Sequence, residues 1–403
     1  MKRLILIFLL SSFGLSALPQ AFINYHRFNS PLPDNSVRSI AIDAQGRKWF
    51  GTDYGMAVFN DTTWNVYTTL NSGLTDNSIK CIRFDANGVA WICTQGGVNT
   101  FDGITWASFT TFNSGITSNM IRYLDIDVND VKWICTESGL NRFDNVNWSH
   151  FDMGNSSLPV NSMGSVRAEN DSVRFVGTIN GGFLTMEDTA FTLYDINNLG
   201  FPDNSIPDIH IDTFGYKWCA TPAGGLVRFY GTSAYTYNFS NSTIPSETFD
   251  AVTADSAGNV YLGSYDMGVV RKQGNNFFSY NTMNSPLPDD LIYSIALERT
   301  GIIWAGTSSQ GVVRIDESLY VGTEQLQKSN SISCFPNPVK DVLYVAGGDG
   351  LKAEVFNSVG EKVISSDLNQ GSITPISFSH LPAGIYYLSI PGEKLNSKKI
   401  IKL

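Results

Sequence analysis

Seven acidic residues recur at one fixed distance before seven aromatic residues. The acids are Asp43, Asp85, Asp127, Glu169, Asp212, Asp255 and Glu298, and six positions after them stand Trp49, Trp91, Trp133, Phe175, Trp218, Tyr261 and Trp304. Carboxylates in such a series can cap tight turns by accepting backbone N–H groups, or they can hold cations. A cation site needs several oxygens that converge on one ion, and one carboxylate per turn does not supply them. We therefore predict turn caps, with no metal site and no cofactor.

A second series of polar residues stands two positions before these acids. Its charged or titratable members are Arg83, Asp125, Arg167 and His210, and their neighbours in the chain are mostly apolar. A polar row of this kind on a buried strand faces either a neighbouring unit or a central channel. The alternation of Arg, Asp and Arg favours ion pairs between neighbouring units, because an unpaired buried charge is costly. Contact with a ligand in the channel is the alternative interpretation.

A third group of polar residues follows the aromatic positions, in turns that differ from one unit to the next. The candidate ligand-binding residues on this rim are Asp53, Tyr54, Gln95, Glu137, Asn180, Tyr265 and Asp266. Binding residues accumulate on loops that a rigid scaffold holds in place. Asn, Asp and Gly are also the residues that turns require, so a purely structural role is the alternative.

Catalytic motifs are absent from the sequence. The chain has 4 histidines, none is spaced to pair with a nucleophile, and neither G-x-S-x-G nor H-E-x-x-H occurs. Asp53, Glu137 and Asp266 could still converge from different units, as in a polysaccharide lyase or hydrolase. We assign no catalytic residue and keep the enzyme as the alternative to a binding protein.

The elements that carry these residues repeat along the chain. The aromatic positions lie 42 or 43 residues apart, and each unit reads as four short strands separated by turn residues. Four strands at this period are typical of one blade of a β-propeller. Residues 22–36 (FINYHRFNSPLPDNS) align without a gap to residues 64–78 (WNVYTTLNSGLTDNS). We therefore predict a seven-bladed β-propeller over residues 22–318, in which residues 22–28 form an outer strand that completes the last blade and removes its open edge.

The repeated core of these units resembles a known family. The segments WFGTDYGMAVFN, WICTQGGVNTFD and WICTESGLNRFD, together with the loops at 29–37 and 71–79, are similar to the two-component regulator propeller repeat. Propellers of that family often form the sensor half of membrane-bound histidine kinases, some of which sense polysaccharide fragments. This chain shows neither a kinase segment nor a transmembrane segment in its mature part, so the resemblance implies binding without phosphotransfer.

The C-terminal part resembles a second family. After a polar linker at 319–332, residues 333–403 contain the PNP tripeptide, the segment LPAGIYYLSI and a basic, apolar end, KKIIKL. These features resemble the C-terminal sorting domain of type IX secretion, found in Bacteroidota. The resemblance implies a small Ig-like β-sandwich, contact with the type IX secretion machinery, and release or attachment at the cell surface.

Composition and charge agree with an exported protein. The formal charge of −10 argues against a nucleic-acid partner. Residues 1–17 read as a signal peptide, with cleavage possible as late as residue 21. The 5 cysteines lack CxxC spacing, and a disulfide between Cys93 and Cys135 stays open.

These observations favour an all-β protein at the cell surface or outside the cell that acts as a binding or interaction module. Its expected ligand is an extracellular glycan, another polymer or a protein. A propeller-fold lyase or hydrolase is the first alternative, and a structural or adhesion component is the second.

Overall fold

The computed structural model describes residues 20–403 except 198–199, 299–300, 320–332, 336–338, 347–351, 369–373 and 390–397. All regular elements in this part of the chain are β-strands. The predicted signal peptide at 1–17 and nearly all of the predicted linker at 319–332 lie outside the described residues. The chain divides into two compact units, residues 1–320 and residues 321–403.

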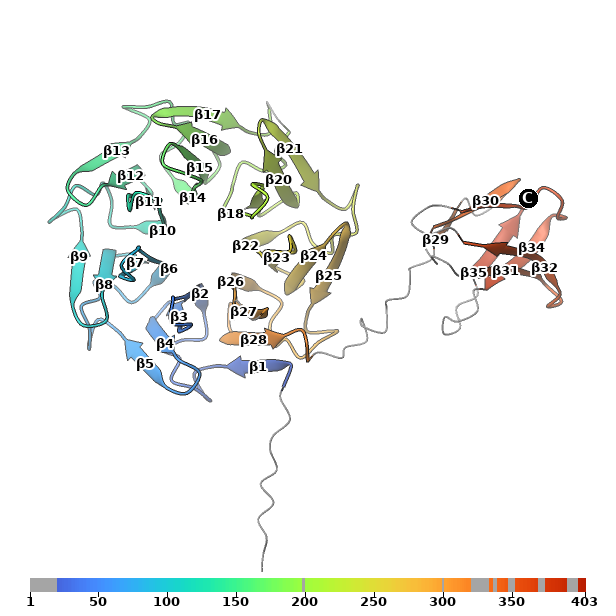
Figure 1. The fold of residues 1–403 in the computed structure, drawn as a ribbon, viewed down its shortest axis with the longest axis horizontal. Coiled ribbons are helices and arrows are strands. Elements are labelled where there is room, and N and C mark those ends of the chain that lie inside the picture. Colours follow the sequence, from blue (N-terminus) through green and yellow to red (C-terminus); the bar gives the residue numbers. More distant parts are fainter. Residues whose placement is uncertain are drawn as a thin grey trace, which may run out of the picture. The chain divides into compact units, whose positions relative to one another are not determined.

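The first unit contains seven four-stranded antiparallel sheets, which Figure 1 shows arranged around a centre. The inner strands are β2 (Val37–Ile42), β6 (Ile79–Phe84), β10 (Ile121–Ile126), β14 (Met163–Ala168), β18 (Asp208–Ile211), β22 (Phe249–Ala254) and β26 (Ile292–Leu297). The second strands are β3 (Lys48–Thr52), β7 (Ala90–Thr94), β11 (Lys132–Thr136), β15 (Val173–Thr178), β19 (Lys217–Ala220), β23 (Val260–Ser264) and β27 (Ile302–Thr307).

The outer half of each sheet is formed by two more strands. The third strands are β4 (Gly55–Phe59), β8 (Gly97–Phe101), β12 (Gly139–Phe143), β16 (Phe183–Glu187), β20 (Leu226–Tyr230), β24 (Val269–Gln273) and β28 (Val312–Asp316). The outer strands are β1 (Phe22–Tyr25), β5 (Trp64–Tyr67), β9 (Trp106–Phe109), β13 (Trp148–Phe151), β17 (Ala190–Tyr194), β21 (Ser233–Tyr237) and β25 (Asn276–Tyr280).

The ring is closed by the first strand of the chain. Strand β1 pairs antiparallel with β28, with Phe22 opposite Ile315 and Tyr25 opposite Val312. The last sheet therefore has the order β1-β28-β27-β26 and combines the two ends of the propeller, as Figure 1 shows. The predicted all-β propeller with an N-terminal closing strand is confirmed.

Five members of the acidic series cap the turn that follows their inner strand, namely Asp43, Asp85, Asp127, Asp212 and Asp255. Asp43 accepts the backbone N–H groups of Gln45 and Arg47 on one oxygen, at 3.0 and 2.8 Å. Its other oxygen accepts the indole N–H of Trp49 at 2.8 Å. The same indole–carboxylate bond recurs at four other Trp positions, namely Trp91–Asp85, Trp133–Asp127, Trp218–Asp212 and Trp304–Glu298. The predicted turn caps are confirmed at these five positions, and the indole bond explains the spacing of six wherever the aromatic residue is Trp. Glu169, which precedes Phe175, binds Lys217 instead, and Asn170 caps its turn.

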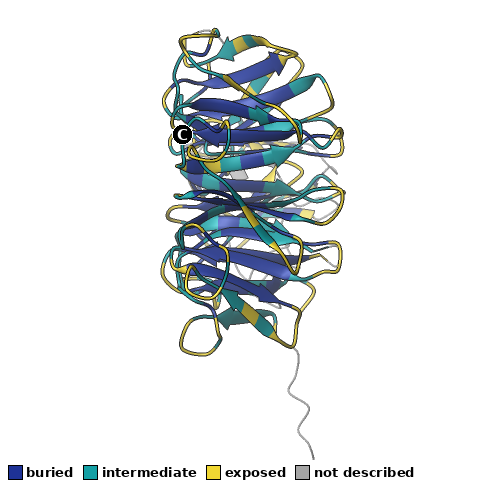
Figure 2. Cartoon of the chain, turned by 90° about the vertical axis from the view of Figure 1, so that its left-hand side faces the viewer, coloured by how far each residue is buried: buried dark blue, intermediate teal, exposed yellow. Residues whose placement is uncertain are grey.

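The core lies between neighbouring sheets. Trp49 is 3 % exposed and packs with Ile82 and Ile92 of the next sheet. Similar clusters connect the other sheets, so the propeller strands are buried between exposed loops, as Figure 2 shows. Flat aromatic side chains suit this packing of one sheet against another.

A glycine begins the third strand of each sheet or directly precedes it, because the outer strand passes close to this position. Gly55 has a φ of 129°, and a Cβ there would lie 2.7 Å from the carbonyl oxygen of Tyr67 on β5. At Gly311, with a φ of 86°, the nearest atom is the carbonyl oxygen of Tyr25 on β1, at 2.1 Å. The closing strand therefore makes the same close approach as an ordinary outer strand.

The second unit contains two antiparallel sheets. One has the order β29 (Ser333–Phe335), β30 (Val342–Ala346), β33 (Thr374–Ser377), and the other has the order β32 (Lys362–Asp367), β31 (Lys352–Asn357), β34 (Gly384–Ser389), β35 (Lys398–Lys402). Leu343 and Ile376 of the first sheet share one buried cluster with Val355 and Leu388 of the second. This arrangement is the predicted β-sandwich. Within the described residues, no helical segment has the length and hydrophobicity that crossing a bilayer requires.

Candidate functional site

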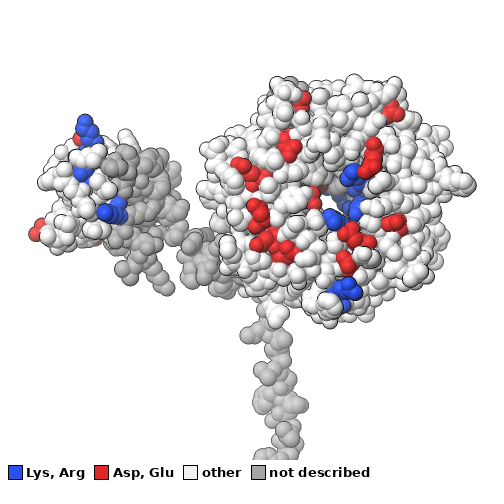
Figure 3. Space-filling view, turned by 180° about the vertical axis from the view of Figure 1, so that it is seen from behind, with Lys and Arg blue, Asp and Glu red and all other residues white. Residues whose placement is uncertain are grey.

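The centre of the propeller contains a cavity of about 590 Å³. Residues from all seven inner strands line it, joined by Gln95, Glu137 and Ile179 from the turns between second and third strands. On the face shown in Figure 3, Lys and Arg side chains lie in the central hollow and Asp and Glu side chains surround it.

In six of the seven inner strands a β-bulge places one residue at this cavity. In six of the inner strands the pairing register shifts directly after the first residue, for example between Val37 and Ser39 in β2. The extra residues are Arg38, Lys80, Arg122, Gly164, Asp250 and Tyr293, and all of them line the cavity. A bulge changes the direction of a side chain without ending the strand.

The rim candidate Asp53 is held between two of these bulge residues. Its oxygens lie 3.2 Å from Arg38 Nε and 3.3 Å from Lys80 Nζ. The hydroxyl groups of Ser36 and Ser78 donate hydrogen bonds to the same carboxylate, at 2.8 and 3.3 Å. Burial opposes ionisation, but the bond from Ser36 and the charges of Arg38 and Lys80 together lower the pKa of Asp53. Asp53 is thus an ionised anchor for two bases at the cavity mouth.

Two other rim candidates line the cavity themselves, whereas Asp53 contacts it through Arg38 and Lys80. Glu137 accepts a hydrogen bond from Arg122 Nη2 at 2.8 Å, and both side chains are largely exposed. Gln95 is an exposed residue of the lining. Tyr265 contacts the lining of the cavity indirectly. Its hydroxyl donates a hydrogen bond to the bulge residue Asp250 at 3.1 Å.

The remaining rim candidates do not line the cavity. Tyr54 is 67 % exposed and does not line the cavity. Asn180 and Ser205 hydrogen-bond each other, and Asp266 accepts the Ser246 hydroxyl at 2.6 Å. Asp53, Glu137 and Asp266, which the enzyme alternative needs together, are therefore bound to three different sets of partners.

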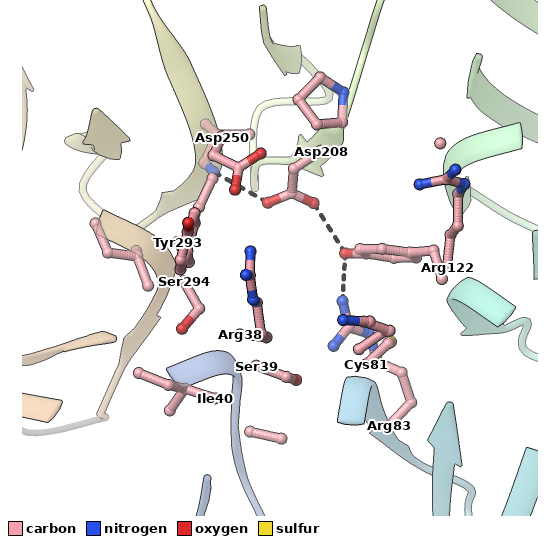
Figure 4. A pocket seen from close by; sticks show the side chains of 18 of the residues that line it. Arg38, Ser39, Ile40, Cys81, Arg83, Arg122, Asp208, Asp250, Tyr293 and Ser294 are labelled. Atoms are coloured by element: carbon pink, nitrogen blue, oxygen red, sulfur yellow. Dashed lines mark hydrogen bonds between the residues drawn. The ribbon is translucent and has the colours of Figure 1, made fainter. Parts of the chain in front are cut away.

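The predicted polar row forms a network deeper in the channel. Asp125 lies 3.9 Å from Arg83 Nε and 3.7 Å from Arg167 Nη1, and Arg167 Nη2 lies 3.4 Å from Asp208. Tyr123 receives a hydrogen bond from Arg83 and donates one to Asp208 at 2.9 Å, as Figure 4 shows. The network links four inner strands, β6, β10, β14 and β18.

His210 lines the cavity next to this network. Burial and the nearby charge of Arg167 lower its pKa to about 4. The imidazole is therefore neutral at physiological pH and acts as a polar wall of the channel.

Several cavity residues were not identified from the sequence. They are the bulge residues Arg38, Lys80, Arg122, Asp250 and Tyr293, together with Tyr123 and Asp208. A signal was present, because the positions three before the predicted row read Arg, Lys, Arg, Gly, Pro, Asp and Tyr, so that three basic residues are followed by four of different character.

One thiol lines the cavity, that of the buried residue Cys81. Cys93 and Cys135 are free buried thiols, so no disulfide joins them. Among the residues that the structure describes, no group of three or more His, Cys, Asp or Glu side chains is placed to hold a metal ion.

Asp250 makes the stability of the propeller depend on pH. Burial raises the pKa of this carboxyl group from 3.8 to about 6, although the Tyr265 hydroxyl opposes the shift. The protonated form is therefore favoured by folding, and this contribution is complete below the ordinary pKa and is lost as pH rises through about 6. Asp250→Asn should be more stable than the wild type by about 1–3 kcal/mol at pH 8.

Urea unfolding of both proteins at pH 4 and pH 8 checks this prediction. The difference between them should nearly vanish at pH 4, where the wild-type carboxyl group is protonated. A difference that stays constant from pH 4 to pH 8 would contradict the proposed cause.

The fold and the cavity define the class of protein, a β-propeller with an appended β-sandwich. Residues 31–54 match the family Two component regulator propeller, and residues 333–403 match the Secretion system C-terminal sorting domain. Both predicted resemblances are confirmed. The chain is thus a secreted or surface-located propeller, and its sorting tail implies contact with the type IX secretion machinery. A search of curated protein sequences gives no match.

Solved structures share the fold at low identity. The extracellular domain of BT3049 from B. thetaiotaomicron, named as a hybrid two component system, has a TM-score of 0.68 at 18% identity, over 96% of this chain and 57% of that one. PorZ, a surface component of the type-IX secretion system of Porphyromonas gingivalis, has a TM-score of 0.59 at 15% identity, over 92% of this chain and 60% of that one. The chain thus spans less than two thirds of either protein.

A smaller propeller enzyme is also similar. Virginiamycin B lyase from Staphylococcus aureus has a TM-score of 0.59 at 12% identity, over 73% of this chain and 97% of that one. At these identities each likeness concerns the fold alone.

Proposed function

We propose that this secreted propeller is a binding module, and that an extracellular glycan or similar polymer docks where the central cavity opens. The observation that carries the proposal is the cavity itself, which at about 590 Å³ lies within the range of small-molecule binding sites. Residues that repeat between the sheets form the scaffold, whereas those that differ between the sheets line the cavity. Specificity in such a site comes from a few polar groups placed on a rigid frame.

Charged and aromatic groups where the cavity opens are suited to binding a polar ligand. Arg38, Lys80 and Arg122 supply donors, and Asp53 and Glu137 hold these side chains in place. Tyr293 adds an aromatic ring to the lining. Hydroxyl-rich polymers are recognised by such mixtures of charged donors and aromatic rings.

One observation favours a second candidate, a lyase or hydrolase. Asp250 lines the cavity with a pKa raised to about 6, and Tyr265 donates a hydrogen bond to it. Carboxyl groups with perturbed pKa values in cavities are candidate general acids or bases. If the protein is an enzyme, Asp250 and Tyr265 are its candidate catalytic residues, in place of the three acids expected from the sequence.

The test is a glycan-panel screen with the purified full chain, followed by a search for cleavage products of every glycan that binds. We expect binding without turnover. Thr253→Trp fills the cavity from β22 and should abolish binding. The matched control Thr192→Trp adds the same side chain on the exposed outer strand β17 and should bind normally. Cleavage products would establish the enzyme instead, and normal binding by Thr253→Trp would place the ligand elsewhere.

A further inference from the structure

We propose that the group of the ligand that enters the cavity is an oxyanion, a carboxylate or a sulfate ester, and that the guanidinium group of Arg38 binds it. The inference rests on the proposed function and names the class of ligand.

Arg38 is held so that the end of its side chain stays free. Its Nε bonds to Asp53 at 3.2 Å, and its guanidinium carbon lies 3.9 Å from the ring centroid of Tyr293. Among the described residues, no acceptor lies within hydrogen-bonding distance of Nη1 or Nη2. In Figure 4 the side chain stands in the middle of the cavity and points toward Asp208 and Asp250. The position of the group is fixed while two of its nitrogens remain available.

The acids across the cavity are already bound to other groups. Asp208 accepts hydrogen bonds from Tyr123 and Arg167, at 2.9 and 3.4 Å, and from the backbone N–H groups of Ile209 and Val252, both at 3.0 Å. Asp250 accepts the Tyr265 hydroxyl. Neither carboxylate forms a hydrogen bond with Arg38, so its two free nitrogens are available to a ligand.

The charges of the mouth are balanced, and its bases lie at the centre. Arg38, Lys80 and Arg122 pair with Asp53 and Glu137, while a third acid, Asp250, is hydrogen-bonded to Tyr265 instead. The deeper bases Arg83 and Arg167 are balanced by Asp125 and Asp208. Basic side chains lie in the central hollow of this face and acidic side chains surround it, as Figure 3 shows. Arg38, with its two free nitrogens, is therefore the group of the mouth that can take up an anion.

The chemistry of arginine narrows the ligand further. A free pair of guanidinium nitrogens matches the two oxygens of a carboxylate or sulfate group in a bidentate arrangement. A neutral sugar offers only hydroxyl and ring oxygens as acceptors, and hydrogen bonds to these are weaker than the charge-assisted pair that a carboxylate or sulfate forms. The cavity therefore selects acidic over neutral polymers.

The test compares two pairs of probes that differ in charge. One pair is an oligogalacturonide and its methyl ester, and the other is dextran sulfate and dextran. The full chain should bind at least one acidic probe, and at least about 10-fold more tightly than its neutral partner. Because the protein carries a formal charge of −10, general adsorption of polyanions is disfavoured and binding reports the cavity.

Variants of Arg38 test the residue itself. Arg38→Gln should weaken binding of the acidic probe by about 10- to 100-fold. Arg38→Lys should bind the acidic probe more tightly than Arg38→Gln but less tightly than the wild type. A lysine keeps the positive charge but lacks the pair of guanidinium nitrogens. The matched control is Arg142→Gln, because the Arg142–Asp144 pair has side-chain exposures of 32% and 28% against 33% and 26% for Arg38–Asp53, and it does not line the cavity. The control should bind normally.

Three results would overturn the inference. They are equal affinity for an acidic probe and its neutral partner, normal binding by Arg38→Gln, and failure of both acidic probes to bind. Neutral glycans that bind in the panel screen would leave the proposed function intact in each of these cases, so the two proposals fail separately.

Discussion

Replacing Asp127 with alanine should destabilise the propeller by about 3–5 kcal/mol, the usual result of removing one partner of a buried ion pair. One oxygen of Asp127 accepts the Trp133 indole N–H at 3.1 Å and the Arg174 guanidinium at 2.9 Å. The other oxygen accepts the backbone N–H groups of Asn129 and Val131, both at 3.0 Å. Arg174 is 5% exposed, so the substitution would leave a buried cation without its carboxylate.

A matched control is Asp102→Ala, in an exposed turn. Asp102 accepts only the backbone N–H groups of Ile104 and Thr105, at 2.8 and 2.6 Å. Its replacement should cost much less, because water can reach the donors that it leaves. Urea unfolding measures both losses, and equal losses would show that the buried pair of Asp127 is not the cause. Asp127→Asn should fall between the two, since the amide keeps an acceptor and loses the charge.

Gly311→Ala should lower the stability of the ring by about 2–4 kcal/mol, as backbone strain and a steric clash combine. The new Cβ would lie 2.1 Å from the Tyr25 carbonyl oxygen on β1. To relieve this contact the closing strand has to move away from β28. We therefore expect faster amide hydrogen exchange in Phe22–Tyr25 as well as a lower unfolding midpoint.

The control for this variant lies in the same sheet. Gly301 has a φ of 79°, close to the 86° of Gly311, but a Cβ there would meet nothing within 4 Å. Gly301→Ala therefore carries the backbone strain without the clash, and it should leave exchange in β1 unchanged. If both variants accelerate exchange in β1 to the same degree, the close approach of Tyr25 does not hold the closing strand.

The fold was predictable because its determinants repeat in the sequence. The acid six positions before each Trp reflects one local contact, the indole–carboxylate hydrogen bond, and both residues of this pair can be recognised in the sequence. The N-terminal strand was predictable for a similar reason, since its segment aligns with other outer strands. These features depend on residues close in the chain or on identity between units.

The site was predictable only in part, because it depends on register and on contacts between sheets. A strand alternates its side chains between two faces, so a sequence pattern assigns Arg38 and Ser39 to opposite faces. The bulge after Val37 interrupts that alternation, and no residue type marks it. The rim positions show the second difficulty. Asp53 and Tyr54 are neighbours in one turn, yet only the side chain of Asp53 forms ion pairs, and one of its partners, Lys80, comes from the next sheet.

The bulges also determine which positions of the propeller tolerate substitution during evolution. A bulge residue has no partner opposite it on the second strand, so its replacement leaves the ladder of backbone hydrogen bonds intact. Six such positions surround one cavity, and they already hold residues as different as glycine, arginine, aspartate and tyrosine. Descendants of one propeller can therefore acquire new ligands by substitutions at these positions while the scaffold stays the same, and a designer could diversify the same six codons as a library.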